Sequence, residues 1–393
     1  MKQIKLGRVL MIIAAVVFFL VLAGPSSVWA EKPVVIAVQA PITGPWAFEG
    51  QMAVQSCKVA AELINKKGGI LGGRMIKVME FDDSGTPKDG ALAAMKIVSN
   101  KNIVGAVSTY GSPTVEASSN IFEKRKMINI AYGATFVGLS QKGRKYFFRT
   151  CGRDDAQGIF FAKFVPKEFN AKRIAIVHNN TTFAIGVAKE TMKALKPKID
   201  SGEVQIVFYD AVNPDDKDFT PVLTKLRESK PDVFYYTGHY PEGALIARQS
   251  KDIGIDCVFV GSNAVINNDF VKIAGVDVAK GWLMTQEPMP TELPYAESKE
   301  FLAAYKKKYG EIPSSPWPIY AADALNILAY AVDKTGSTDP DILEDYLHNK
   351  ANDVPGVTGP IGFTAQGDRE GVPYLMYVVN EKGEFALYKA KMK

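Results

Sequence analysis

The chain has 393 residues, of which 47% are hydrophobic and 23% charged, the balance of an ordinary globular protein. Its formal net charge is +5 at pH 7, and it falls to +2 once the basic residues of the first thirty positions are set aside. The sequence contains no stripe of Lys and Arg interleaved with aromatic residues, so we expect no nucleic-acid partner. The length favours two domains.

The first thirty residues have the three-part pattern of a secretory signal peptide. A basic start with Lys2, Lys5 and Arg8 precedes the apolar run "MIIAAVVFFLVLAG", and "SSVWA" supplies the small residues of a cleavage site. The apolar run is short for a membrane span, which needs about 20 residues. We therefore expect cleavage after Ala30 and an exported protein without a membrane anchor.

The first part of the mature chain alternates apolar runs with helical patterns. Strands are expected at 34–40, 75–83, 103–109 and 127–133, with helices at 49–67, from Pro87 onward and at 113–124. Continuous apolar strands that alternate with helices are typical of a parallel sheet covered on both faces. The sequence predicts a doubly wound lobe here.

The same alternation then starts again. Strands are expected at 146–151, 173–180, 204–210, 233–238, 257–262 and 374–379, and helices include 155–169, 241–253, 295–309 and 317–334. The predicted fold class is therefore α/β, with two doubly wound parallel-sheet lobes.

Residues suited to catalysis or metal binding are few and scattered. No HExxH, GxSxG, Walker or strand-linked GxGxxG motif occurs, so we expect no enzyme and no cofactor. The three cysteines and three histidines show no spacing that suits a metal site: Cys57, Cys151, Cys257, His178, His239 and His348. The sequence leaves open whether any two of the cysteines form a disulfide.

Loops after the predicted strands carry the candidate binding residues. Open α/β sheets bind ligands at the carboxyl ends of their strands. There, "STYGSPT" (108–114) offers small hydroxyl donors at the start of a helix, which favours an anion. The same loops are rich in aromatic side chains, which favours a ligand with an apolar body: Trp46, Phe48, Tyr110, Tyr132, Phe136, Phe183, His239 and Tyr240.

Several motifs in the same order resemble the leucine/isoleucine/valine-binding family of periplasmic ABC-transporter substrate-binding proteins. They are "APITGPWAFEGQ", "AAELINKKGGILGGR", "VMEFDDSGTPKDGA", "RIAIVHNNTTFAIG", "YYTGHYPEG" and "IPSSPWPIYAADAL". The resemblance implies a periplasmic, monomeric binding subunit of an ABC importer, which delivers its ligand to an inner-membrane permease.

The same resemblance implies a type I Venus flytrap with a three-strand hinge. Its crossings between lobes would lie near 149–153, 279–286 and 356–363. Lobe 1 would then comprise 31–150 plus 282–357, and lobe 2 would comprise 151–281 plus 358–393.

The family's ligand contacts fall on identifiable positions of this chain. Its carboxylate-binding serine corresponds to Ser112, and the next strand end supplies Gly133 and Thr135. In this interpretation Ser112, Thr135 and nearby N–H groups hold a ligand carboxylate through charge-assisted hydrogen bonds. The full expected set of ligand-binding residues is Ser112, Gly133, Thr135, Trp46, Phe48, Glu49, Tyr110, Gly111, Phe183, His239, Tyr240 and Asn263.

The sequence departs from the family where an amino-acid ammonium would bind. Asn263 stands in place of the family's glutamate and His239 in place of a tyrosine, with Tyr240 beside it. An amide cannot supply the charge that a desolvated ammonium needs. Glu49 or Asp155 could supply it from another direction.

Two hypotheses on the ligand therefore stay open: branched-chain or related amino acids, or aromatic or aliphatic acids without an α-ammonium. An exported ligand-sensing domain is the alternative to an importer subunit.

Overall fold

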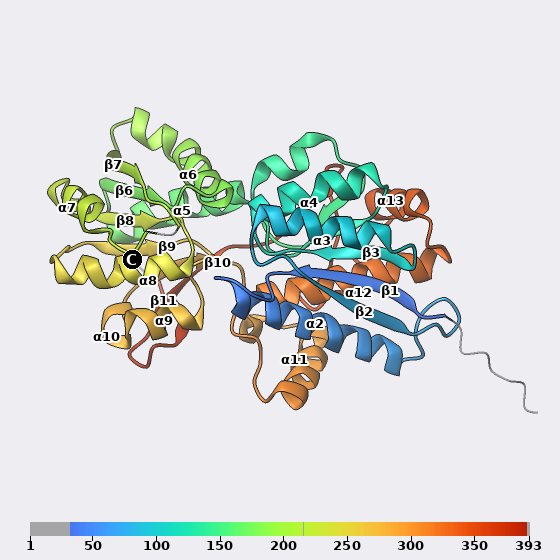
Figure 1. Ribbon diagram of the computed structural model, residues 1–393. Helices are drawn as coiled ribbons and strands as arrows, with labels where there is room; N and C mark the ends of the chain where they lie inside the picture. The colour runs from blue at the N-terminus through green and yellow to red at the C-terminus, as the bar shows by residue number, and fades with distance from the viewer. Residues whose placement is uncertain (1–31, 215, 391–393) are drawn as a thin grey trace, which may run out of the picture.

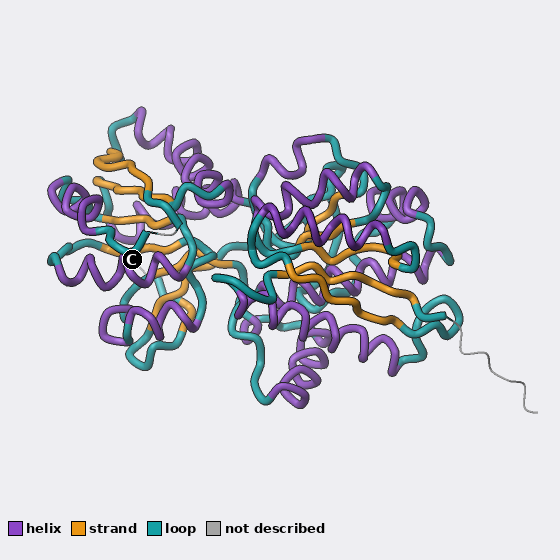
Figure 2. The backbone as a smooth tube through the Cα atoms, in the orientation of Figure 1, coloured by secondary structure: helices purple, strands orange, loops and turns teal. Residues whose placement is uncertain are grey.

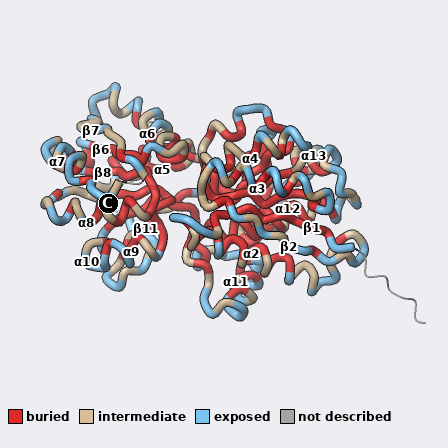
Figure 3. The backbone as a smooth tube through the Cα atoms, in the orientation of Figure 1, coloured by how far each residue is buried: buried red, intermediate tan, exposed pale blue. Residues whose placement is uncertain are grey.

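Two sheets, each covered by helices, form two lobes that lie side by side in the computed structural model (Figure 1). It describes residues 32–214 and 216–390, so the expected signal peptide and its cleavage site lie outside the described residues. In both lobes the strands lie between helices (Figure 2), and the central strands of each sheet are largely buried (Figure 3). Within the described ranges, no helix combines the length and apolarity that a membrane crossing requires.

The first lobe contains a five-stranded parallel sheet with the order β2-β1-β3-β4-β5. Its strands are β1 (Val34–Ala40), β2 (Ile76–Asp82), β3 (Ile103–Ser108), β4 (Asn129–Ala131) and β5 (Phe147–Arg149). Three helices connect these strands, namely α2 (Ala47–Lys66), α3 (Pro87–Ser99) and α4 (Ser112–Lys124), and η1 (Val137–Lys142) follows β4. Three later helices return to this lobe and pack on it: α11 (Ala296–Tyr309), α12 (Trp317–Thr335) and α13 (Pro340–Asn349).

Local sequence explains why these elements form where they do. All seven residues of β1 are buried, as a continuous apolar run in a covered sheet requires. Helix α3 begins with Pro87 at its first position, and the Thr86 side chain caps it by accepting the Asp89 N–H.

The second lobe contains a seven-stranded mixed sheet with the order β12-β11-β10-β9-β8-β6-β7. Its strands are β6 (Arg173–His178), β7 (Gln205–Ala211), β8 (Val233–Tyr236), β9 (Val258–Gly261), β10 (Leu283–Gln286), β11 (Leu375–Val379) and β12 (Phe385–Leu387). Strands β11 and β12 run antiparallel to their neighbours. The helices are α5 (Asp154–Phe169), α6 (Thr182–Asp200), α7 (Thr220–Glu228), α8 (Tyr240–Asp252), α9 (Asn268–Ala274) and α10 (Val276–Ala279), and η2 (Pro290–Glu292) follows β10.

The predicted α/β fold with two parallel-sheet lobes is confirmed, but the expected lobe boundaries need two corrections. Strand β10, placed in lobe 1 by the boundary at 282, pairs with β9 and β11 of the second sheet. The second crossing is therefore 287–295 and not 279–286. In addition, residues 358–369 stay with the first lobe, where Phe363 packs on Phe148 and Asp368 pairs with Arg149. The third crossing is therefore 370–374 and not 356–363.

The three cysteines carry free thiols. Cys57 and Cys151 are fully buried and Cys257 partly so. Burial raises the pKa of each thiol, and that of Cys257 rises to about 12.

Candidate ligand-binding site

Loops from the strand ends of the two sheets touch across the junction between the lobes. Trp46, in the loop after β1, stacks on His239, in the loop after β8, with ring centroids 4.5 Å apart. Next to this pair the Tyr240 hydroxyl donates to the Pro45 carbonyl at 2.7 Å. The carboxyl ends of both sheets therefore meet at one place, as the sequence predicted.

A small cavity lies at this junction, and about 10 Å³ of it is open to the centre of a water molecule. Its lining residues come from both lobes: Tyr110, Gly111, Ser112, Gly133, Phe183, His239, Ala264 and Trp317. Six of the eight belong to the expected ligand-binding set. Ala264 and Trp317 were not anticipated, although Trp317 lies in the quoted stretch "IPSSPWPIY", where Pro316 and Pro318 indicate a helix start.

Ser112 begins helix α4 and is buried. Its Oγ accepts the Phe136 N–H at 3.4 Å, so the hydroxyl proton stays free to donate. A Cβ at Gly133 would come within 3.0 Å of the Tyr110 backbone, and one at Gly111 within 2.7 Å of the Trp46 ring. Because both residues are glycines, the Tyr110 backbone and the Trp46 indole can pack closely against the loops beside the start of α4.

Aromatic rings form most of the remaining wall. Tyr110 makes edge contacts with Trp46 and Trp317, both at 5.7 Å between centroids, and Phe183 lies 5.0 Å from His239. Burial lowers the pKa of His239 to about 3, so this imidazole is neutral at physiological pH. The wall suits an apolar ligand body and offers it no cation.

Six expected residues lie outside the cavity wall: Trp46 and Tyr240, which make the interlobe contacts described above, and Phe48, Glu49, Thr135 and Asn263. Thr135 is buried beside Asp154, and its side chain partly offsets the rise of the Asp154 pKa to about 7 that burial causes. Phe48 lies under the Lys272 ammonium of the second lobe, 5.4 Å from its ring centroid. Asn263 immediately precedes the lining residue Ala264.

The two carboxylates expected near a ligand ammonium are both occupied by protein groups. Asp155 pairs with Arg153 at 2.7 Å and is about one-third exposed. Glu49 is buried, and its carboxylate accepts hydrogen bonds from Asn267 Nδ2 and Ser315 Oγ, each at 2.6 Å. Because Asn267 precedes α9 of the second lobe, Glu49 joins the two lobes. Burial raises its pKa to about 7.

A buried carboxylate that the sequence analysis missed lies next to Asn263. Asn263 Nδ2 donates to Glu287 Oε2 at 3.3 Å. Glu287 also accepts from the Tyr374 hydroxyl at 3.1 Å and from the Gly152 N–H at 3.3 Å. Burial raises the pKa of Glu287 to about 7, and these bonds offset part of the rise. The signal available in the sequence was the short run "WLMTQ", with three apolar residues at its start, which leads directly into Glu287 and Pro288.

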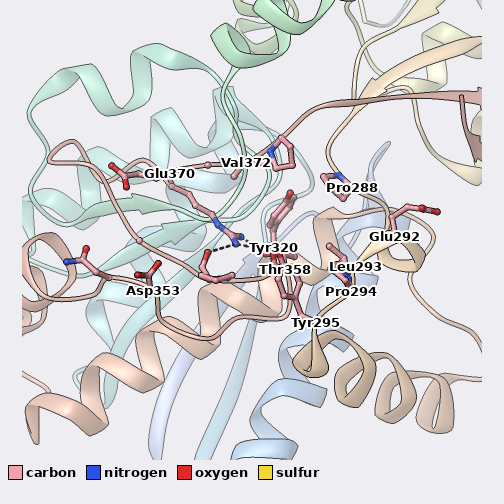
Figure 4. Close-up of a pocket in the computed structure, with 16 residues that line it drawn as sticks. Pro288, Glu292, Leu293, Pro294, Tyr295, Tyr320, Asp353, Thr358, Glu370 and Val372 are labelled. Atoms are coloured by element: carbon pink, nitrogen blue, oxygen red, sulfur yellow. Dashed lines mark hydrogen bonds between the residues drawn. The ribbon is translucent and has the colours of Figure 1, made fainter. Parts of the chain in front are cut away.

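A second and larger cavity, of about 550 Å³, lies at the hinge (Figure 4). Pro288 and Glu292 of the second crossing line one side of it, and Asp353 and Glu370 line the other. It shares no lining residue with the interlobe cavity. Most of its wall belongs to connecting segments rather than to strand ends, so the small interlobe cavity is the better candidate for the ligand site.

Arg369 is the buried cation in the wall of this hinge cavity. It lies 3.5 Å from Asp323 and donates to the carbonyls of Thr358, Gly359 and Pro360. Arg369 thus links the segment 358–360 to Asp323 of α12, and its role is structural.

The fold and site define a two-lobed binding protein that encloses a small ligand between α/β lobes. Residues 33–384 match the model of the family described as "Periplasmic binding protein", and the chain belongs to this family. The resemblance to its leucine/isoleucine/valine-binding members is confirmed by relatives that match over nearly the whole chain.

Among these relatives is the Leu/Ile/Val-binding protein BraC3 of Rhizobium johnstonii, which is 31% identical over 88% of this chain and 92% of its own. The leucine-specific-binding protein of Salmonella typhimurium is 32% identical over 90% and 93%. A solved leucine binding protein, LivK of Thermotoga maritima, has a TM-score of 0.82 at 25% identity and covers 91% of this chain and 98% of its own. LivJ of Streptococcus pneumoniae, solved in complex with isoleucine, has a TM-score of 0.80 at 26% identity over 90% and 98%.

Proposed function

We propose that this protein is the substrate-binding subunit of an ABC importer. It holds a branched-chain or related amino acid, or another small hydrophobic carboxylate, between its lobes and delivers it to an inner-membrane permease. The observation that carries this proposal is the aromatic cavity at the junction of the two sheets, with Ser112 at a helix start in its wall. Export, cleavage after Ala30 and action as a monomer are parts of the same proposal.

The start of helix α4 accounts for binding of a carboxylate. The first N–H groups of a helix lack partners within the helix and carry the positive end of its dipole. Ser112 adds a hydroxyl donor at that point, and the loops at Gly111 and Gly133 bring more backbone close to it. A ligand carboxylate here would receive charge-assisted hydrogen bonds while its apolar part packs on Tyr110, Trp317 and Phe183.

Acids without an α-ammonium are the second candidate class. Asn263 carries no charge, and His239 is neutral at physiological pH. Neither residue alone offsets the cost of burying an ammonium.

Isothermal titration calorimetry tests the proposal. The probes are leucine, isoleucine, valine, 4-methylpentanoate and benzoate, added to the mature chain. Ser112→Ala should weaken every ligand that binds by about 10- to 100-fold, because a hydrogen bond to a charged group contributes about 1.5–3 kcal/mol. Ser119→Ala is the matched control, since Ser119 lies on the same helix and donates to Asn129 instead. Equal affinities in the two variants, or no binding of any small carboxylate, would contradict the proposal.

A further inference from the structure

Glu287 is a buried carboxylate with no cation beside it. It is fully shielded from solvent, and its three hydrogen-bond donors are all neutral: Asn263 Nδ2, the Tyr374 hydroxyl and the Gly152 N–H. Within the described part of the chain, the buried arginines Arg149 and Arg369 pair with aspartates, and no ion pair includes Glu287. A buried charge without a partner of opposite sign is costly. This position is therefore suited to a positive group from outside the chain.

Asn263 lies beside this carboxylate and directly precedes a residue of the cavity wall. Its Nδ2 points to Glu287, so its Oδ1 points elsewhere, and Oδ1 is buried without a hydrogen-bond partner. Gln286 Nε2 donates to the Asn263 backbone carbonyl at 2.9 Å and fixes the loop. The next residue, Ala264, lines the cavity. Asn263 Oδ1 is thus a hydrogen-bond acceptor without a donor. The negative charge of Glu287, on the Nδ2 side of the same amide, polarises it and strengthens Oδ1 as an acceptor.

The other buried carboxylates near the junction are less suited to this role. Both oxygens of Glu49 accept short bonds of 2.6 Å, and one of these bonds joins the lobes. Asp154 has the Arg149 charge near it, which lowers its pKa against the larger effect of burial. Asp155 pairs with Arg153. Glu287 combines longer bonds of 3.1–3.3 Å with an adjoining open acceptor.

We propose that Asn263 Oδ1 accepts a hydrogen bond from a ligand ammonium and that Glu287 is the counter-charge behind it. The protein then prefers α-amino acids over acids of the same skeleton without the amine. This inference rests on the proposed function, because the same ligand must place its carboxylate at Ser112. Asn263 is the contact residue in this arrangement, and Glu287 is a positioning and charge-compensating residue.

The test compares each amino acid with its des-amino partner by calorimetry: leucine with 4-methylpentanoate, valine with 3-methylbutanoate, and phenylalanine with 3-phenylpropanoate. The native protein should bind at least one amino acid at least about 30-fold more tightly than its partner. Glu287→Gln should remove most of that preference and leave the des-amino acid within about threefold. Asn267→Ser is the matched control, because it alters the other buried glutamate and should weaken both members of a pair equally.

The outcomes separate the two proposals. If the des-amino acids bind as tightly as the amino acids, or if Glu287→Gln weakens both members of a pair equally, the inference is wrong and the proposed function stands. If nothing in either series binds, the proposed function fails, and the inference fails with it.

A measurement on the native protein covers the case in which Glu287→Gln does not fold. With a pKa of about 7, Glu287 is mostly protonated at pH 6, so an ammonium ligand should expel about one proton on binding. The proton count is obtained by calorimetry at pH 6 in two buffers of different ionisation enthalpy. A des-amino acid should release none, and equal release by both would contradict the inference.

Other titratable groups lie near Glu287 and must be considered in the proton count. Glu49 and Asp154 also have a pKa of about 7, whereas Tyr110, Tyr320 and Tyr374 stay neutral because burial raises their pKa values. Proton release that persists in Glu49→Gln and in Asp154→Asn would assign the proton to Glu287. Its loss in either variant would contradict that assignment.

Discussion

Glu49 and Glu287 are two glutamates at the same junction with the same degree of burial and different surroundings. Burial raises the pKa of each from 4.5 to about 7. Glu49 accepts two short bonds of 2.6 Å, from Asn267 of the second lobe and Ser315 of the first. Glu287 accepts three longer bonds of 3.1–3.3 Å around the hinge. Similar desolvation therefore does not imply the same role. Glu49 joins the two lobes, whereas Glu287 contacts Asn263, which lies beside the ligand cavity.

The largest expected effect is on the pH dependence of stability, where both glutamates should contribute alike. A carboxyl group whose folded pKa is raised stabilises the fold fully below its unfolded pKa and loses that contribution as pH rises through the folded pKa. Between about pH 4.5 and 7 each glutamate should therefore remove about 3 kcal/mol from the free energy of unfolding. Urea unfolding across this range should show a shallower loss in Glu49→Gln and in Glu287→Gln than in the native chain.

Adding ligand should separate the two glutamates in that experiment. Saturating leucine should abolish the contribution of Glu287 and leave that of Glu49. Asp154 and Asp83, whose pKa values burial raises to about 7 and 6, add a background common to all variants. If neither substitution changed how the free energy of unfolding varies with pH, these carboxyl groups would not be desolvated as described.

A middle-sized effect should come from the lobe-joining bond of Glu49. Asn267→Ser keeps a side-chain oxygen to cap α9 but is too short to reach Glu49. The affinities for leucine and for 4-methylpentanoate should both fall about tenfold, since a bond to a charged group contributes about 1.5 kcal/mol or more. Small-angle scattering should also show a larger radius of gyration. A loss confined to leucine would mean that Glu49, and not Glu287, senses the ammonium.

The smallest effect should come from the hydroxyl of Tyr240, which donates to Pro45 between the lobes. Tyr240→Phe should speed ligand release about three- to fivefold, because a neutral hydrogen bond contributes about 1 kcal/mol. Stopped-flow fluorescence of Trp46, which stacks on His239, can follow this release. Tyr388→Phe is the control, since Tyr388 binds Glu168 within the second lobe. The same acceleration in both variants would contradict a role for the Tyr240 bond in closure.

The sequence predicted what depends on local chemistry. The apolar run of β1, the Pro87 helix start and the hydroxyl-bearing start of α4 all have local causes, and the structure has them where expected. The order of strands at the hinge was not predictable in this way, because β10 lies between β9 and β11, and β11 follows almost a hundred residues later.

The surroundings of three site residues were not predictable for a related reason. Glu49 stands at a helix start, where a carboxylate is usually solvated, and it is buried by Asn267 of the other lobe and by Ser315, which is far away in the chain. Glu287 and Trp317 likewise gain their surroundings from segments distant in the chain, such as Tyr374 and Tyr110. Local sequence patterns identify hydrogen-bond donors at strand ends. They do not show which carboxylates are buried, because that depends on how distant segments pack at the junction of the lobes.

The contacts between the lobes also bear on how a bound molecule is handed over. The Tyr240–Pro45 and Asn267–Glu49 bonds and the Trp46–His239 stack must all break before the lobes part. The lifetime of these interlobe contacts therefore adds to that of the ligand's own contacts in setting how long a molecule stays enclosed. A transporter that grips each lobe separately and pulls them apart would empty the protein without touching its cargo.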